Sequence, residues 1–124
     1  MSSSEDAKTL IETAVRRFLE EVPALEPIKI VVVVELHGRG DVQVYRLEMP
    51  GTKVTKGDDP AARVRVEMPR AFFNIMAKEA GIADWREAFT YGQAKATGNQ
   101  QVLQLIERVV AKQEERNRTR RASH

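Results

Sequence analysis

The stretch Phe89-Thr-Tyr-Gly-Gln-Ala-Lys-Ala-Thr-Gly-Asn99 is the most informative part of this chain for its fold. It predicts a glycine-bounded strand over residues 90–97 that leads into an amphipathic helix. Small residues inside a strand give up packing, so Gly92, Ala94 and Ala96 leave space on one face of the strand. We expect this space to hold a ligand or to admit the close approach of another element.

Outward from this stretch, apolar periodicity and glycine or proline punctuation divide the rest of the chain into short elements. Strands and helices follow one another without regular β-α-β alternation, which indicates an α+β layer fold with helices packed on one face of a mainly antiparallel sheet. In chain order, the predicted elements are a helix over 4–21, a strand over 28–36, a hairpin partner over 42–49, a short polar strand or turn over 52–56, a strand over 62–68, a helix from Pro69 closed by Gly81, a short helical turn capped by Asp84, the strand over 90–97, and a helix from Asn99 to about Lys112.

Length and composition predict one domain with a single modest core. The chain has 124 residues and no cysteine, which excludes disulfides, thiol nucleophiles and thiolate metal sites. The longest uninterrupted apolar run, Ile30 to Val34, is far too short to cross a bilayer, and residues 1–6 lack the features of a secretory signal. We therefore expect a cytoplasmic protein.

The formal net charge of +2 is unevenly distributed along the chain. The segment 112–124 balances to +3, with five basic and two acidic residues, whereas the remainder, with 15 basic and 16 acidic residues, balances to −1. We expect 1–112 to form the domain and 113–124 a disordered basic tail, with contact to anionic lipid headgroups or a nucleic-acid arm as alternatives. The near-neutral charge of the remaining residues does not indicate a basic surface for nucleic acid on the domain itself. The basic residues of the segment are Lys112, Arg116, Arg118, Arg120 and Arg121.

The pattern Phe89-x-x-Gly92 followed by Gly98-Asn99 and a leucine-bearing helix resembles the sterol carrier protein type 2 (SCP2-like) domain family. The resemblance covers roughly residues 28–110. Two positions depart from the family pattern: Gln93 stands where a lysine is usual, and Ala94 where a bulky apolar residue is usual. The resemblance implies a five-stranded, mainly antiparallel sheet covered by helices, enclosing an apolar tunnel for a sterol, a fatty acid or a fatty acyl-CoA, with no cofactor.

Helix faces packed on a strand of small residues are where space would remain, so we expect apolar residues of these elements to line the tunnel. For each of them the alternative is an ordinary core position. Trp85 and Tyr91 are expected near the tunnel mouth, where an amphipathic ring has one end in water. The predicted ligand-binding residues are Phe72, Phe73, Ile75, Met76, Phe89, Ala94, Val102, Leu103, Ile106 and Val109.

The sequence offers no grouping that predicts catalysis. Neither a Ser-His-Asp arrangement nor a phosphate-binding glycine loop can be assembled, His37 has no second histidine nearby, and Asp58 and Asp59 are expected to be solvated. The predicted function is non-catalytic binding and transfer or presentation of a hydrophobic ligand. The alternative is an accessory module whose cavity is filled by its own side chains and which acts through dimerisation or a partner enzyme.

Overall fold

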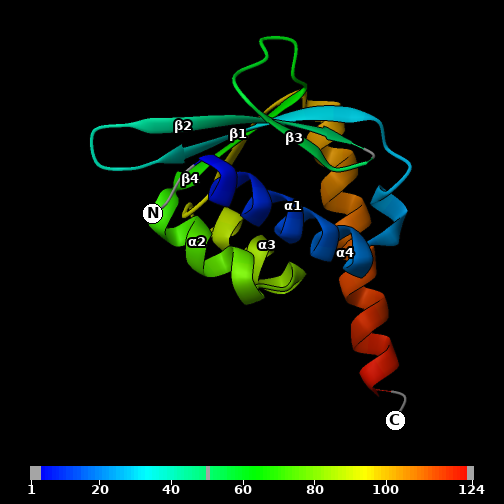
Figure 1. The fold of residues 1–124 in the computed structure, drawn as a ribbon. Helices are drawn as coiled ribbons and strands as arrows, with labels where there is room; N and C mark the ends of the chain where they lie inside the picture. The colour runs from blue at the N-terminus through cyan, green and yellow to red at the C-terminus, as the bar shows by residue number, and fades with distance from the viewer. Residues whose placement is uncertain (1–3, 50, 123–124) are drawn as a thin grey trace.

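The computed structural model describes residues 4–49 and 51–122. Five strands form one sheet in the order β3-β2-β1-β4-β5, in which β1 and β4 are parallel and the other neighbours antiparallel (Figure 1). The predicted five-stranded, mainly antiparallel sheet is therefore confirmed. The strands are β1 (Ile30–His37), β2 (Val42–Met49), β3 (Lys53–Lys56), β4 (Val64–Pro69) and β5 (Lys95–Gly98).

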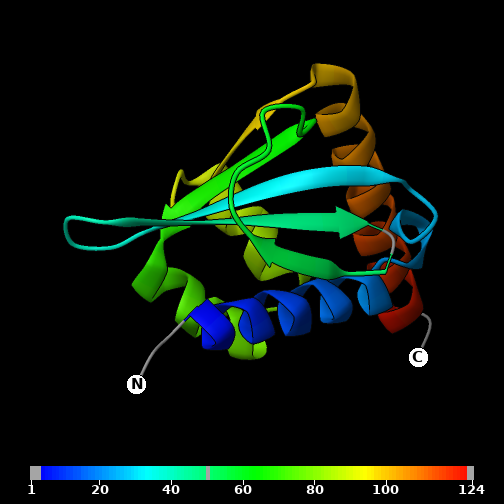
Figure 2. The same ribbon diagram turned by 45° about the horizontal axis from the view of Figure 1, so that its top comes forward.

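The helices lie together on one face of the sheet, which gives the molecule two layers (Figures 1 and 2). The first helix has the predicted bounds, and β1 and β2 form the predicted antiparallel hairpin. No helix in the described ranges is both long enough and apolar enough to span a membrane. The helices are α1 (Ser4–Glu21), α2 (Arg70–Glu79), α3 (Ile82–Thr90), α4 (Gln100–Ala122) and the short 3-10 helix η1 (Pro23–Leu25).

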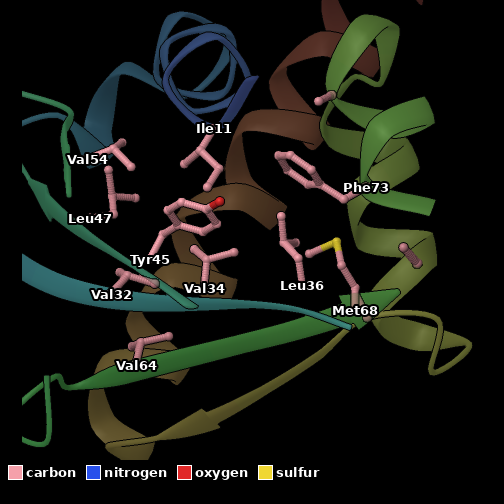
Figure 3. Close-up of a cluster of buried hydrophobic side chains, with 13 residues drawn as sticks. Ile11, Val32, Val34, Leu36, Tyr45, Leu47, Val54, Val64, Met68 and Phe73 are labelled. Carbon is pink, nitrogen blue, oxygen red and sulfur yellow. The ribbon is translucent and has the colours of Figure 1, made fainter. Parts of the chain in front are cut away.

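Strand alternation places one set of side chains in the core between sheet and helices. On β1, Val32, Val34 and Leu36 are buried and face the helices (Figure 3). Their neighbours across the sheet include Tyr45 on β2 and Met68 on β4. Ile11 of α1 and Phe73 of α2 cover this cluster from the helical layer (Figure 3).

The opposite face of the sheet is crossed by the loop over residues 57–63 (Figures 1 and 2). Arg46 donates to Asp59 at 2.8 Å, and Arg65 donates to Asp58 at 2.9 Å and to Glu35 at 2.9 Å. These two arginines fasten the loop to β2 and β4. Asp58 is exposed, as expected, whereas Asp59 is only 22% exposed, and arginines on neighbouring strands pair with both carboxylates.

Acidification is expected to weaken this attachment. The hydrogen bond from Arg65 is the main cause that lowers the pKa of Asp58 below 3.8, and the hydrogen bond from Arg46 lowers the pKa of Asp59 in the same way. A carboxylate whose pKa is lowered by folding stabilises the folded state above its unfolded-state pKa, and this contribution disappears as the pH falls through the folded-state pKa. The urea concentration at the unfolding midpoint should therefore decrease as the pH is lowered below about 4.

The Asp58→Asn/Asp59→Asn variant should show a smaller fall in midpoint between pH 7 and pH 3 than the wild type. A matched control is Glu20→Gln/Glu26→Gln, which removes two exposed carboxylates that form no ion pair within the described residues. If the aspartate variant and the wild type lose stability in parallel, the loop attachments contribute nothing.

The predicted strand over residues 90–97 begins too early. Helix α3 continues to Thr90 and ends in a Schellman motif: Gly92 N–H bonds to the Phe89 carbonyl and Gln93 N–H to the Ala88 carbonyl at 2.9 Å. Gly92 has a φ of +80°, so it terminates a helix instead of lying in a strand. Strand β5 begins only at Lys95.

Gly81 was expected to close the second helix, and this is also wrong. Helix α2 ends at Glu79, and Gly81 is the N-cap of α3 in an extended conformation, with φ −95° and ψ −177°. The Asp84 carboxylate accepts the Gly81 N–H at 2.9 Å, so Asp84 supports the cap from within the helix. The short turn expected there is consequently a helix of nine residues.

The last helix is longer than predicted. It was expected to end near Lys112, with a disordered tail after it, but α4 continues to Ala122. Gln113 is 9% exposed and donates to Asn117 at 3.1 Å, and Glu114 pairs with Arg86 of α3. Contacts of residues beyond 112 with the rest of the protein therefore carry the helix onward.

Candidate functional site

A cavity of about 760 Å³ lies between the sheet and the helices. This volume falls within the range of pockets that hold small molecules. Its lining comes from α1, η1, α2, α3, α4 and four of the five strands, and is mostly aliphatic or aromatic. The cavity is therefore an internal feature of the two-layer arrangement and not a depression in one element.

Short side chains on the sheet form part of the cavity lining, which we call its floor, and they leave space above the strands. Val32 and Val34 of β1 and Val64 and Val66 of β4 form this floor, and Ala96 of β5 extends it. Leu36 and Tyr45 on the same sheet face are fully buried and do not line the cavity.

Two helices supply the walls. Helix α1 contributes residues at helical spacing, including Ile11, Val15 and Phe18, and α4 contributes Leu103 and Ile106. The helices thus present apolar stripes that do not meet across the cavity. This geometry can bury a long apolar molecule.

Aromatic rings of α2 and α3 close one side of the cavity. Phe73 and Trp85 both line it, and their ring centroids are 6.4 Å apart at an interplanar angle of 42°. Trp85 is half-buried. The position of this tryptophan, the only one in the chain, makes it a reporter of occupancy.

Polar lining residues gather where α3 ends, β5 begins and α4 begins. All of them are exposed, which identifies this region as the mouth of the cavity. Arg86 at the mouth pairs with Glu114, an ion pair that links α3 to α4. The ionisable groups of the lining lie at this rim, so the interior offers burial without acid or base groups. The polar lining residues are Arg86, Thr90, Lys95, Gln100, Gln104 and Glu107.

The predicted site residues divide into two groups. Phe73, Phe89, Ala94, Leu103 and Ile106 line the cavity, as does Trp85, which was expected at the mouth. Tyr91 is 74% exposed and does not line it. The remaining predicted residues also lie outside the lining: Phe72, Met76 and Val102 pack against the main core, Val109 packs against a second cluster, and Ile75 is 68% exposed. Contact of any of these residues with a ligand stays a prediction.

Sequence reasoning missed the α1 wall and the valine floor. The periodic apolar residues of α1 and the alternation of β1 and β4 were visible in the sequence, but the same patterns mark ordinary core. Whether a cavity forms depends on the distance between the sheet and the helices. The periodicity of a single segment gives no information on that distance.

Glu35, His37 and Glu67 bring three ligand-type atoms within 4.8 Å of one another on the face of the sheet opposite the helices. Glu35 is already engaged by Arg65 at 2.9 Å, and His37 Nε2 lies 3.5 Å from the other Glu35 oxygen. Arg65 therefore already occupies one carboxylate of this group.

No family model matches the sequence, and no curated protein matches it. Among solved structures, the chain is similar to palmitated SCP2L2 from Aedes aegypti, with a TM-score of 0.55 and 16% identity over 81% of this chain and 93% of that one. It is similar to Aedes aegypti sterol carrier protein 2 in complex with palmitate (TM-score 0.51, 18% identity, 90% and 97% covered). It is also similar to a ubiquinone synthesis protein, UbiJ-SCP2 (TM-score 0.52, 18% identity, 89% and 97% covered). The chain has the SCP2-like fold, as the resemblance implied.

Proposed function

We propose that this SCP2-like chain binds one hydrophobic ligand in its cavity and transfers or presents it without catalysis. The observation that carries the proposal is the 760 Å³ apolar cavity with polar groups confined to its mouth. A fatty acid, a fatty acyl-CoA or a sterol has the matching division between a long apolar body and a small polar end. Two similar structures are described with palmitate, which supports this ligand class.

Burial of a hydrocarbon chain is sufficient for useful affinity. A sixteen-carbon chain has about fourteen methylene groups, each contributing roughly 0.8 kcal/mol on burial, or about 11 kcal/mol in total. Association offsets several kcal/mol of this. The remainder corresponds to a dissociation constant of roughly micromolar order.

Titration of the delipidated protein with a fluorescent fatty acyl probe tests the proposal, read by energy transfer from Trp85. We expect saturable one-to-one binding in the micromolar range and displacement by palmitate or by a sterol. Trp85 lines the cavity, so a probe inside it lies within close range of the indole. An absence of binding up to tens of micromolar, with an intact circular dichroism spectrum, would contradict the proposal.

A second candidate is an accessory domain that acts through dimerisation or a partner enzyme. The similarity to a ubiquinone synthesis protein favours it. The version in which the cavity is filled by the protein's own side chains does not agree with the 760 Å³ cavity. A protein that binds no probe but forms a dimer in analytical ultracentrifugation would favour this candidate over the carrier.

A further inference from the structure

One row of residues runs along α4 at intervals of four positions. Four of its members, Arg108, Lys112, Arg116 and Arg120, are cations and all four are exposed; we call them the basic ridge. Residues four apart on a helix are neighbours on its surface. At 1.5 Å per residue the ridge extends for about 18 Å along the helix axis.

The ridge carries a net positive charge that other groups do not neutralise. Within the described residues none of its four side chains forms an ion pair, and Arg116 contacts the neutral side chain of Gln113 at 3.4 Å. Glu115, three positions after Lys112, is the acidic residue of α4 nearest to this face, which leaves the face at +3. Arg118 lies apart from the ridge, in a small depression that also contains Glu21 and Glu114.

The ridge begins beside the cavity mouth and turns away from it, because each step of four residues rotates about 40° around the helix axis. Gln100 and Gln104 line the mouth, and Arg108 is the next residue at the same spacing. Leu105, 42% exposed, lies one helical turn before Arg108. The C-terminal turns of α4 extend beyond the other helices (Figure 1).

We infer that the basic ridge docks on an anionic lipid bilayer. Phosphate and carboxylate headgroups complement the four cations, and Leu105 can enter the headgroup region beside them. Single-stranded nucleic acid is bound through aromatic rings that stack on bases, and α4 contains no aromatic residue. This inference goes beyond ligand binding, and its test does not require a bound ligand.

Co-sedimentation with phosphatidylcholine vesicles, with and without phosphatidylserine, tests the inference. The ridge variant is Arg108→Gln/Lys112→Gln/Arg116→Gln/Arg120→Gln. Each cation near an anionic surface raises partitioning roughly fivefold, so the variant should bind phosphatidylserine vesicles at least a hundredfold more weakly than the wild type. Wild-type binding should also fall as salt is raised, because the Debye length shortens.

A control variant of equal charge, Lys29→Gln/Arg39→Gln/Lys53→Gln/Arg63→Gln, removes four exposed cations elsewhere. It should lose no more than a few-fold in binding. Arg118→Gln, on the same helix but off the ridge, should bind as the wild type does and shows that α4 tolerates such a change. Circular dichroism of every variant confirms that the fold is retained.

Three results would overturn the inference. The first is equal loss of binding in the ridge and control variants, which would show a response to net charge alone. The second is binding to phosphatidylcholine vesicles as strong as to phosphatidylserine vesicles. The third is a wild type that ignores both vesicles but binds single-stranded RNA through the ridge, which would assign the ridge to nucleic acid.

Discussion

Gly98→Ala is expected to destabilise the protein by about 3 kcal/mol or more. Gly98 has a φ of +132°, a conformation that residues with a side chain rarely adopt. A Cβ at this position would stand 2.2 Å from the Arg63 carbonyl oxygen and 3.1 Å from the Val64 Cα. Backbone of the neighbouring strand cannot move aside as a flexible side chain can, so both strain and overlap act against the folded state.

The loss would reach the cavity, because Gly98 pairs with Val64 and thereby holds β5 against β4. Urea unfolding gives the stability difference, and Gly92→Ala is the matched control. Gly92 also has positive φ, at +80°, but a methyl group added there would meet nothing within 4 Å. We expect about 1 kcal/mol of loss there from backbone strain alone. Similar losses at both glycines would show that the contact with Arg63 is unimportant.

The elements that sequence reasoning located well are those whose own periodicity determines them. The first helix carries a continuous apolar stripe that Pro23 ends, and its predicted bounds match. The hairpin of β1 and β2 was found from β-branched residues and the glycines between the strands, and β4 from its alternation of apolar and charged residues. In these segments the local preference and the tertiary arrangement agree.

The errors concern residues whose state is decided by partners distant in sequence. Small residues around Gly92 are compatible with a strand, but the packing of Ala88 in the core extends α3 and makes the glycine a helix terminator. The segment after Lys112 lacks an apolar stripe and was expected to be disordered. The local sequence pattern does not reveal the contacts made by this segment. These are the ion pair between Glu114 and Arg86 and the burial of Gln113.

The candidate site was predicted only in part. The direction in which each helical face points was not resolved from the sequence. On α2 the buried line is Phe73 and Ala77, and Ile75 lies about 200° around the helix from Phe73. The helical period alone therefore separates Ile75 from Phe73 and places Ile75 outside the site. The valine floor could not be separated from core in the same way, since that distinction depends on the gap between layers.

Leu103→Trp and Ile106→Trp are each expected to lower the affinity for a fatty acyl probe roughly fiftyfold while the fold is retained. Both side chains line the cavity from α4, so an indole placed there occupies space that a ligand would use. Exclusion of about three methylene groups of a bound chain removes about 2.4 kcal/mol, which is the stated change in affinity. The empty volume accommodates the larger side chain without overpacking, so the unfolding midpoint should change little.

Leu105→Trp is the matched control, since Leu105 lies on the same helix but is 42% exposed and outside the cavity lining. Its affinity should equal that of the wild type, because the indole points into solvent. Displacement of a fluorescent probe by palmitate measures all three variants without relying on Trp85 emission, which the added tryptophans would obscure. Unchanged affinity in both cavity variants would place the ligand elsewhere, whereas loss in Leu105→Trp alone would move the site to the exposed face of α4. A loss confined to the two inward positions is the result that a ligand held between the sheet and α4 requires.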